Sequence, residues 1–234
     1  MSNPYFQFKQ FSVWHDKCAM KVGTDGVLLG AWVRVDSATC SVLDVGAGTG
    51  LIALMIAQRH AEAEIDAVEI DREACEQASD NVGKSPFKSR INVIHQSFPE
   101  YATAKTYDLI VSNPPFFAHS LKSPDRKRNA ARHDDTLPLR LLIGHATEML
   151  SENGRIALLL PVQLSEELDF VTATHRLFQT RRTDVIPAEG LAPKRFLTEL
   201  SAQNLPKKTD TLVLETACRE RTRQYRELTE DFYL

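Results

Sequence analysis

The stretch "VLDVGAGTGL", residues 42–51, places three glycines directly after a short apolar run. Such a run is typical of a buried strand, and ligands of doubly wound α/β sheets bind outside the carboxyl ends of these strands. The spacing of Gly46, Gly48 and Gly50 departs from the dinucleotide fingerprint G-x-G-x-x-G, because Leu51 stands where the third glycine is required. A Walker loop would need Lys followed by Ser or Thr, and that pair is missing. The stretch predicts a ligand-binding loop whose spacing does not suit a dinucleotide.

Outward from this loop, short apolar runs alternate with longer helical patterns, as in a parallel sheet wound with helices. The expected strands are residues 41–46, 64–70, 91–97, 107–113, 154–161, 182–187 and 195–202. Only residues 188–194 separate the last two, too few for a helix, so this pair should be antiparallel. We predict an α/β, Rossmann-like fold: a seven-stranded, mostly parallel sheet with the last strand antiparallel.

The chain is expected to form a single domain over residues 1–234, because a chain of this length builds one sizeable core. A helical pattern at 25–33 and an extended pattern at 5–14 come before the first strand. We therefore interpret residues 1–40 as an N-terminal extension and residues 41–234 as the Rossmann-like core.

The composition is that of a soluble globular protein, with 43% hydrophobic and 25% charged residues. An apolar run of the roughly 18 residues that cross a bilayer is missing, and the first residues lack the layout of a signal peptide. We expect a cytoplasmic protein without membrane contact. The four cysteines and seven histidines have no metal-ligand spacing, so free thiols and no metal are expected.

The charge distribution says more than the net charge of −3, which by itself disfavours a generic nucleic-acid binder. Residues 41–93 contain five Lys or Arg against nine Asp or Glu. Residues 122–132, "KSPDRKRNAAR", contain five basic residues and only Asp125 as an acid. An acidic half is thus followed by one concentrated basic segment.

Two acidic residues accompany the glycine loop. Asp44 precedes it and offers a carboxylate for an ammonium group, while Glu69, at the end of the next strand, offers two acceptors for a ribose diol. Glycines let a backbone lie against a ligand without interference from Cβ atoms. This arrangement suits a nucleoside with an amino-acid tail, and it resembles the first two motifs of the Rossmann-like S-adenosylmethionine-dependent methyltransferases. A plain turn and a nicotinamide-dependent oxidoreductase are the alternatives.

The resemblance implies a class I methyltransferase fold with S-adenosyl-L-methionine as cofactor, bound by Asp44, Gly46, Gly48, Gly50 and Glu69. In that family a polar residue near the end of the third strand contacts the donor adenine. In this sequence Gln96 or Ser97 would take that part.

The fourth expected strand leads into the turn "SNPPFF", residues 112–117, whose residues indicate how an amine could be activated. An amine conjugated to a ring is a poor nucleophile, and accepting hydrogen bonds from both of its N–H groups frees the lone pair. Asn113 Oδ1 and the Pro114 carbonyl oxygen supply two acceptors, and the prolines hold them in place. Phe116 offers a face on which a flipped base can stack. Phe117 is better explained as a packing residue.

Asn113, Pro114, Pro115 and Phe116 are identified as the N-P-P-[FY] motif of amino methyltransferases, which makes them the candidate catalytic residues; the resemblance also places Asn113 among the residues that contact the cofactor. Members of that class modify adenine N6, cytosine N4, guanine N2 or glutamine N5. DNA-modifying members carry an extra recognition domain, and glutamine-modifying members carry Tyr after the prolines and a separate helical domain. These features are missing from the present sequence.

From end to end the chain resembles the bacterial methyltransferases that modify adenine N6 in valine tRNA. The resemblance rests on residues 10–33, on the N-P-P-F turn with its basic segment, on "PKRFLTEL" and on the ending "YRELTEDFYL". It implies the adenosine immediately 3′ of the anticodon as target, and an N-terminal segment around Thr24 that closes over the methionine end of the donor. Asp25 is explained equally well as a helix N-cap.

The basic segment fits an RNA substrate. Its position directly after the catalytic turn indicates phosphate binding on either side of a flipped nucleotide, with a solvated surface loop as the alternative. The residues concerned are Lys122, Arg126, Lys127, Arg128 and Arg132. The C-terminal "CRERTRQYR", residues 218–226, is a weaker signal that an exposed helix face explains.

We predict an adenine-N6 methyltransferase acting on tRNA, with the anticodon stem-loop as partner, no DNA substrate and a monomeric state. A ribosomal RNA guanine-N2 methyltransferase is the alternative enzyme. A catalytically idle RNA-binding or adaptor protein is the alternative from another class, and the intact set of Asp44, Glu69 and Asn113 argues against it.

Overall fold

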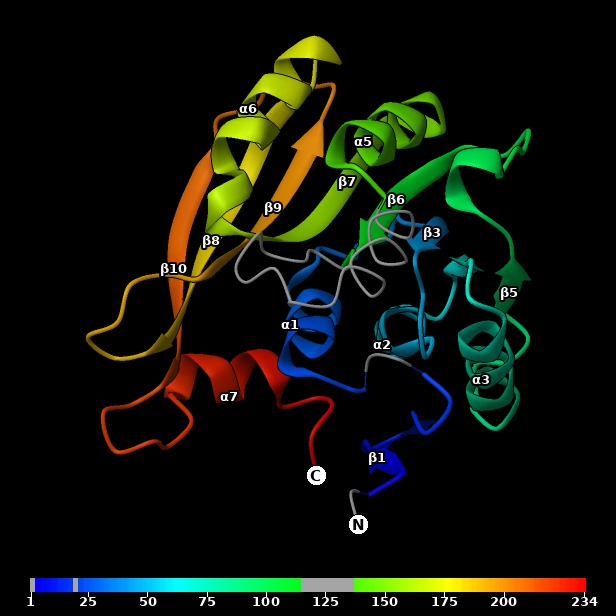
Figure 1. Ribbon diagram of the computed structural model, residues 1–234, viewed down its shortest axis with the longest axis horizontal. Coiled ribbons are helices and arrows are strands. Elements are labelled where there is room, and N and C mark those ends of the chain that lie inside the picture. The colour runs from blue at the N-terminus through cyan, green and yellow to red at the C-terminus, as the bar shows by residue number, and fades with distance from the viewer. Residues whose placement is uncertain (1–2, 19–20, 115–136) are drawn as a thin grey trace, which may run out of the picture.

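The computed structural model describes residues 3–18, 21–114 and 137–234 (Figure 1). Its helices are α1 (Thr24–Trp32), α2 (Leu51–Arg59), α3 (Arg72–Gly83), α5 (Leu139–Glu148), α6 (Ser165–Thr174) and α7 (Arg223–Thr229), with 3-10 turns η1 (Phe98–Glu100) and η2 (Val162–Leu164). Its strands are β1 (Tyr5–Gln7), β2 (Ser12–Trp14), β3 (Ser41–Val45), β4 (Glu64–Glu69), β5 (Ile91–His95), β6 (Tyr107–Ser112), β7 (Leu150–Pro161), β8 (Phe178–Ala188), β9 (Arg195–Ser201) and β10 (Lys208–Glu215).

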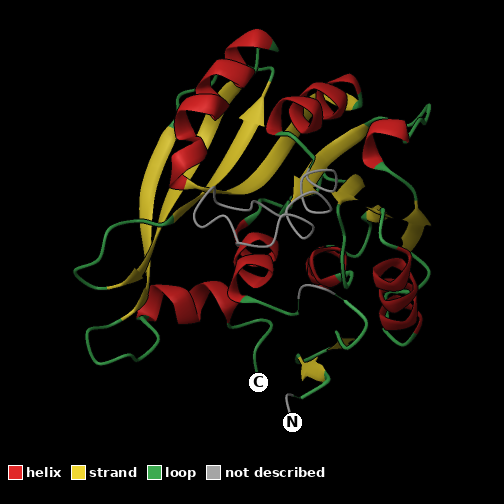
Figure 2. Ribbon diagram, in the orientation of Figure 1, coloured by secondary structure: helices red, strands yellow, loops and turns green. Residues whose placement is uncertain are grey.

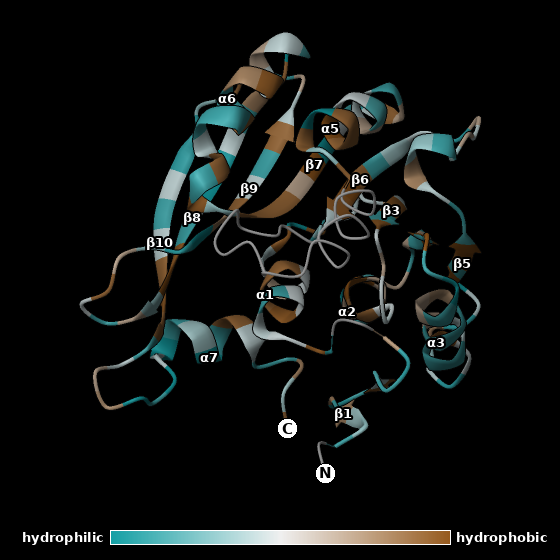
Figure 3. Cartoon of the chain, in the orientation of Figure 1, coloured by the Kyte–Doolittle hydropathy of each residue, from teal (hydrophilic) through white to brown (hydrophobic). Residues whose placement is uncertain are grey.

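The main sheet has the strand order β10-β8-β9-β7-β6-β3-β4-β5, and β9 runs antiparallel to both of its neighbours (Figure 2). The seven expected strands are all present, and the antiparallel pairing of the last two is confirmed. The eighth strand, β10, was missed in the sequence because its first four residues, Lys208 to Thr211, are exposed and polar. Such residues protect an edge strand from pairing with other chains, and they hide its pattern (Figure 3).

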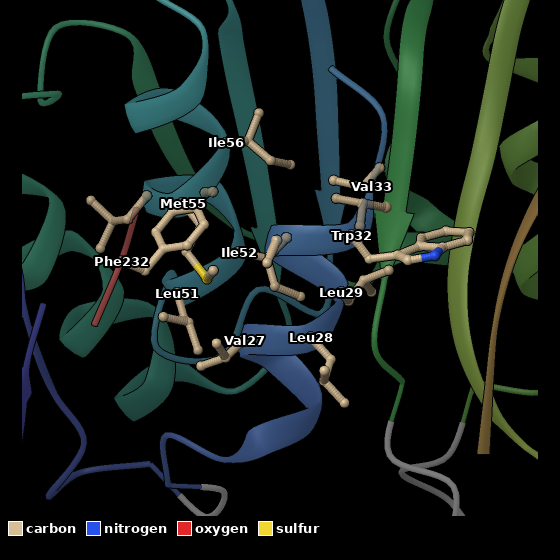
Figure 4. Packing of buried hydrophobic residues seen from close by; sticks show 14 of the residues in the cluster. Val27, Leu28, Leu29, Trp32, Val33, Leu51, Ile52, Met55, Ile56 and Phe232 are labelled. Atoms are coloured by element: carbon tan, nitrogen blue, oxygen red, sulfur yellow. The ribbon is translucent and has the colours of Figure 1, made fainter. Parts of the chain in front are cut away.

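Two apolar layers cover the sheet. Alternate residues of each strand face opposite sides, so that Val42 joins a cluster with α1 and α2, and Leu43 joins a cluster with α5 and α6. Side chains of α1 and α2 interdigitate with Phe232, close to the C-terminus (Figure 4).

A glycine sets the distance between α1 and α2. A Cβ atom at Gly30 would lie 2.7 Å from Met55 Sδ, so only a residue without a side chain permits this contact. Arg59 fixes the same pair by donating to the carbonyl oxygens of Gly30 and Val33 at 3.0 and 2.6 Å. Both helices consequently begin at the edge of the sheet where the parallel strands end.

The N-terminal segment is anchored to α3. The backbone of Trp14 exchanges two hydrogen bonds of 2.9 Å with the side chain of Asn81, and the amide of Lys17 donates to Gln77 Oε1 at 3.2 Å. Because both side chains are buried on α3, residues before the first core strand are held beside the loop that follows β3.

Candidate active site

The loop between β3 and α2, residues 46–50, is called the glycine loop. Gly46, Gly48 and Gly50 have φ angles of 71°, 55° and 77°, a region that residues with a Cβ atom rarely adopt. Cβ atoms at Gly46 and Gly48 would meet nothing within 4 Å. The glycines are therefore needed for the path of the backbone, and they leave open space above it for a ligand.

Asp44 lies beneath this loop and is fully buried. Its Oδ2 accepts a hydrogen bond of 3.1 Å from the amide of Ala53, in the first turn of α2. Its Oδ1 is buried and has no hydrogen-bond partner among the residues that the structure describes. Burial, with a smaller contribution from the charge of Glu69, raises the pKa of the carboxyl to about 7. A cationic group placed against Oδ1 would satisfy the orphaned acceptor and favour the ionised form.

Glu69 ends β4 and is oriented by the backbone on both sides. The amide of Gly48 donates to its Oε2 at 2.7 Å, and the amide of Asp71 donates to its Oε1 at 2.9 Å. Each carboxylate oxygen keeps a further lone pair, because such an oxygen accepts two hydrogen bonds. The side chain is thus held as a rigid pair of acceptors beside the open face of the glycine loop.

Gln96 and Ser97 follow β5 at the same edge. The amide of Gln96 donates to the carbonyl oxygen of Glu69 at 3.0 Å, which brings the two strand ends together. The side-chain Nε2 of Gln96 donates to the carbonyl oxygen of Glu100 at 2.9 Å, whereas Ser97, at the N-cap of η1, makes no capping bond with its hydroxyl. Both residues lie at the edge of the sheet where a contact to the donor adenine is expected.

Asn113 and Pro114 follow β6, the strand next to β3. Ser112 donates from Oγ to the carbonyl oxygen of Val45 at 2.8 Å, which fixes the end of β6 to the start of the glycine loop. Asn113 is half-buried, and its amide group makes no hydrogen bond to any residue within the described ranges. The side-chain amide is therefore available to a ligand.

Several predicted residues lie outside the described residues. They are Pro115, Phe116 and Phe117 and the basic residues Lys122, Arg126, Lys127, Arg128 and Arg132. For these positions the sequence-based interpretation stands as a prediction.

The start of α1 differs from one expectation. The N-cap of α1 is Gly23, so the interpretation of Asp25 as the cap was wrong. Thr24 is exposed in the first turn, and Asp25 reaches across to β9, where its Oδ2 lies 2.9 Å from Arg195 Nε. This partner comes from the tertiary structure, because the sheet places the guanidinium of Arg195 beside the start of α1. The sequence around Asp25 does not show this contact.

Sequence reasoning also missed Asn81. This residue has no exposed surface, and its Nδ2 donates to the carbonyl oxygen of Thr49 in the glycine loop as well as to Trp14. An asparagine in the last turn of a polar helix carries no distinguishing pattern, so nothing in the sequence marks it.

The geometry fits S-adenosylmethionine. The orphaned Asp44 oxygen matches the ammonium of its methionine part, the oriented Glu69 carboxylate matches a ribose diol, and the open glycine loop accommodates the link between them. Over the described parts of the chain, no group of three or more His, Cys, Asp or Glu is placed to hold a metal ion, and no helix could span a membrane.

The fold and this site define a Rossmann-like methyltransferase that uses S-adenosylmethionine as methyl donor. The family model described as "Methyltransferase small domain" matches residues 23–182. A protein of Parabacteroides distasonis named tRNA1(Val) (adenine(37)-N6)-methyltransferase is 51% identical over 100% of this chain and 99% of its own length. A protein of the same name from Bacteroides thetaiotaomicron is 45% identical, with the same shares covered. The chain therefore belongs to the methyltransferase small domain family. Within it, the chain belongs to the family of the tRNA1(Val) (adenine(37)-N6)-methyltransferases.

Solved structures support the fold. A predicted O-methyltransferase, Atu636 of Agrobacterium tumefaciens, superposes with a TM-score of 0.69 and 20% identity over 89% of this chain and 96% of that one. The glycopeptide N-methyltransferase MtfA, solved with S-adenosylmethionine, superposes with a TM-score of 0.56 and 14% identity over 79% and 90% of the two chains. At these identities the likeness shows the common fold alone.

Proposed function

We propose that this enzyme transfers a methyl group from S-adenosylmethionine to N6 of adenine 37 in tRNA1(Val), which is the reaction in the names of its full-length relatives. The observation that carries the chemistry is the position of Asn113. Its unoccupied amide group follows β6, one strand away from the buried Asp44 on β3. A methyl acceptor at Asn113 would stand next to a donor held over β3 and β4.

In this proposal the donor-binding residues act as follows. Asp44 pairs with the ammonium, Glu69 accepts from both ribose hydroxyls, and Gly46 and Gly48 let the backbone lie against the ligand. One of the two polar residues after β5 contacts the adenine. Residues 1–40 form an extension to the core, and Thr24 in this extension closes over the methionine end.

Asn113 acts on the acceptor. Its Oδ1 and the Pro114 carbonyl oxygen accept from the two N–H groups of the adenine amine, which turns the nitrogen lone pair toward the donor. S-adenosylmethionine supplies an electrophilic methyl group on a sulfonium. Asn113 therefore needs only to position the amine for in-line attack, and the amine's proton leaves to solvent after transfer. Pro115 stiffens the turn, and Phe116 stacks on the flipped base.

The RNA is held electrostatically in this scheme. The basic segment, residues 122–132, contacts phosphates on either side of the flipped nucleotide. We propose that the enzyme acts as a monomer in the cytoplasm, because one chain supplies every residue assigned above. Light scattering on the purified protein, alone and with tRNA, tests the monomeric state.

Mass spectrometry of nucleosides tests the reaction. Unmodified valine tRNA is folded, incubated with the protein and labelled donor, and digested; the expected product is N6-methyladenosine. A transcript with guanosine at position 37 is the matched control and should remain unlabelled. A short single-stranded oligomer of the loop sequence should also fail, because RNA recognition by a small domain relies on loop shape and unstacked bases.

Two results would contradict the proposal. N2-methylguanosine in ribosomal RNA, with no change in tRNA, would identify the alternative enzyme. RNA binding without methyl incorporation into any RNA would identify an idle binding protein.

A further inference from the structure

A guanidinium group lies on the acceptor side of the site and has no assigned role. Arg195 begins β9, and its Nε lies 2.9 Å from Oδ2 of Asp25 in α1. The side chain of Arg195 is 41% exposed, and its two terminal nitrogens make no hydrogen bond to any described residue. An arginine whose Nε is paired with a carboxylate presents its two terminal nitrogens as a fork, which matches the oxygens of a phosphate or carboxylate.

The register of the sheet places Arg195 relative to the proposed methyl acceptor. Ser112, Leu158 and Thr198 form one row across β6, β7 and β9. Because β9 is antiparallel, Arg195 lies three residues beyond this row in the direction in which β6 leads into Asn113. The two intervening strand spacings separate β6 from β9 by roughly 10 Å.

Asp44 and Arg195 belong to the same face of the sheet, and Asn113, directly after β6, continues the alternation of that strand toward the same side. Alternation along each strand gives them the side of Val42, Val111 and Leu197, which pack in the cluster with α1 and α2. The contacts agree, since Asp44 bonds to α2 and Arg195 to α1. Across the sheet, the carboxylate of Asp44 on the donor side, the amide of Asn113 and the guanidinium of Arg195 therefore follow one another in that order.

A second arginine, Arg182, is paired with a carboxylate in the same way and has further partners for its guanidinium. Arg182 on β8 has the same 2.9 Å distance between Nε and a carboxylate, in this case that of Asp184. In addition it donates to Ser165 Oγ at 2.7 Å, and its guanidinium lies 4.0 Å from the ring centre of Phe196. Its side chain is only 17% exposed. Within the described ranges Arg195 lacks these further partners, and the other oxygen of Asp25 is buried without a hydrogen-bond partner there.

We propose that Arg195, held in place by Asp25, binds a phosphate of the methyl-accepting nucleotide and so positions its base at Asn113. This inference rests on the proposed function. It makes Arg195 a positioning residue for the RNA, located on the opposite side of Asn113 from the donor.

Steady-state methylation of folded tRNA at saturating donor tests the proposal. Arg195→Gln should raise KM for tRNA roughly tenfold or more, as expected when a charge-assisted hydrogen bond is removed, with kcat changed by less than about threefold. The dependence of log affinity on log salt should flatten by about 0.7 to 0.9, which a purely structural role would not produce. Arg195→Lys should restore part of the affinity. Asp25→Asn should have a smaller effect, because it removes the ion pair that orients the guanidinium but leaves the guanidinium itself in place.

Arg182→Gln is the matched control, because it breaks an equivalent pair on the other face and should leave KM for tRNA unchanged. Circular dichroism and thermal unfolding show whether each variant folds. If Arg195→Gln instead weakens donor binding in calorimetry and leaves KM for tRNA intact, the guanidinium serves the donor's carboxylate and the proposal is wrong. Parent-like behaviour in every assay would also overturn it. A parent enzyme unable to methylate tRNA would refute the proposed function itself.

Discussion

The side-chain amide of Asn81 donates a hydrogen bond of 2.9 Å to the carbonyl oxygen of Thr49, and so ties α3 to the glycine loop. The same amide group donates to the carbonyl oxygen of Trp14 and accepts from the Trp14 amide. One buried side chain thereby connects the N-terminal segment, the loop expected to bind the donor and the helix behind it.

Replacing Asn81 with Ala should destabilise the fold and the site together. The change removes three hydrogen bonds and leaves the buried carbonyl group of Thr49 and the partly buried backbone groups of Trp14 unpaired, which lowers the free energy of unfolding by about 2 to 4 kcal/mol. Chemical denaturation measures this decrease, and calorimetry should show weaker donor binding. Asn204→Ala, in the exposed segment between β9 and β10, is the control. Equal stability of Asn81→Ala and the parent would mean that water replaces the missing bonds.

The buried Asp44 predicts a pH dependence of donor binding. The pKa of this carboxyl is about 7 in the free protein, and an adjacent ammonium favours ionisation and lowers it. Binding should therefore release a proton below pH 7, and affinity for the demethylated product should fall by up to about tenfold per pH unit as the pH drops from 7. Calorimetry in buffers of different ionisation enthalpy measures the released proton.

Asp44→Asn should abolish this pH dependence and weaken binding at pH 8 as well. Asp80→Asn, on the exposed side of α3, is the matched control, and its donor binding should depend on pH as that of the parent does. Binding that is independent of pH in the parent would argue against an ammonium at Asp44.

Asn113→Ala should separate donor binding from methyl transfer. The donor is held by residues on β3 and β4, so its affinity should stay within about twofold, while turnover should fall by roughly 10²- to 10³-fold because an oriented acceptor is removed. Single-turnover methylation of tRNA measures the chemical step. Phe116→Ala should act more mildly, by removing a stacking interaction of roughly 1 to 3 kcal/mol. An Asn113→Ala enzyme as fast as the parent would refute the assigned mechanism.

The basic segment should contribute affinity and not chemistry. Changing Arg126, Lys127 and Arg128 together to Ala removes up to three cations that pair with phosphates, which flattens the slope of log affinity against log salt by about 0.7 to 0.9 for each phosphate that is no longer neutralised. The rate at saturating tRNA should stay near that of the parent. Filter binding over a salt series measures the slope, and an unchanged slope would make the segment an ordinary solvated loop.

The local sequence was sufficient to predict the strands and the glycines on the side of the site where the donor is expected to bind. Buried parallel strands are nearly continuous apolar runs, and a loop of positive φ needs glycine, so β3, β4 and the glycine loop are visible without any knowledge of their neighbours. The same reasoning identified Asp44 and Glu69, because each stands at a strand end where the fold class places its ligands.

Other features depend on contacts between distant segments. The strand β10 takes its place only because β8 offers a partner, and its polar first half hides it from pattern analysis. The pairing of Asp25 with Arg195 joins α1 to β9, and the three hydrogen bonds of Asn81 join segments that are far apart in the chain. Periodicity reports what a residue's own strand or helix buries, whereas these polar partners are selected by how the elements pack, and only the tertiary structure decides that.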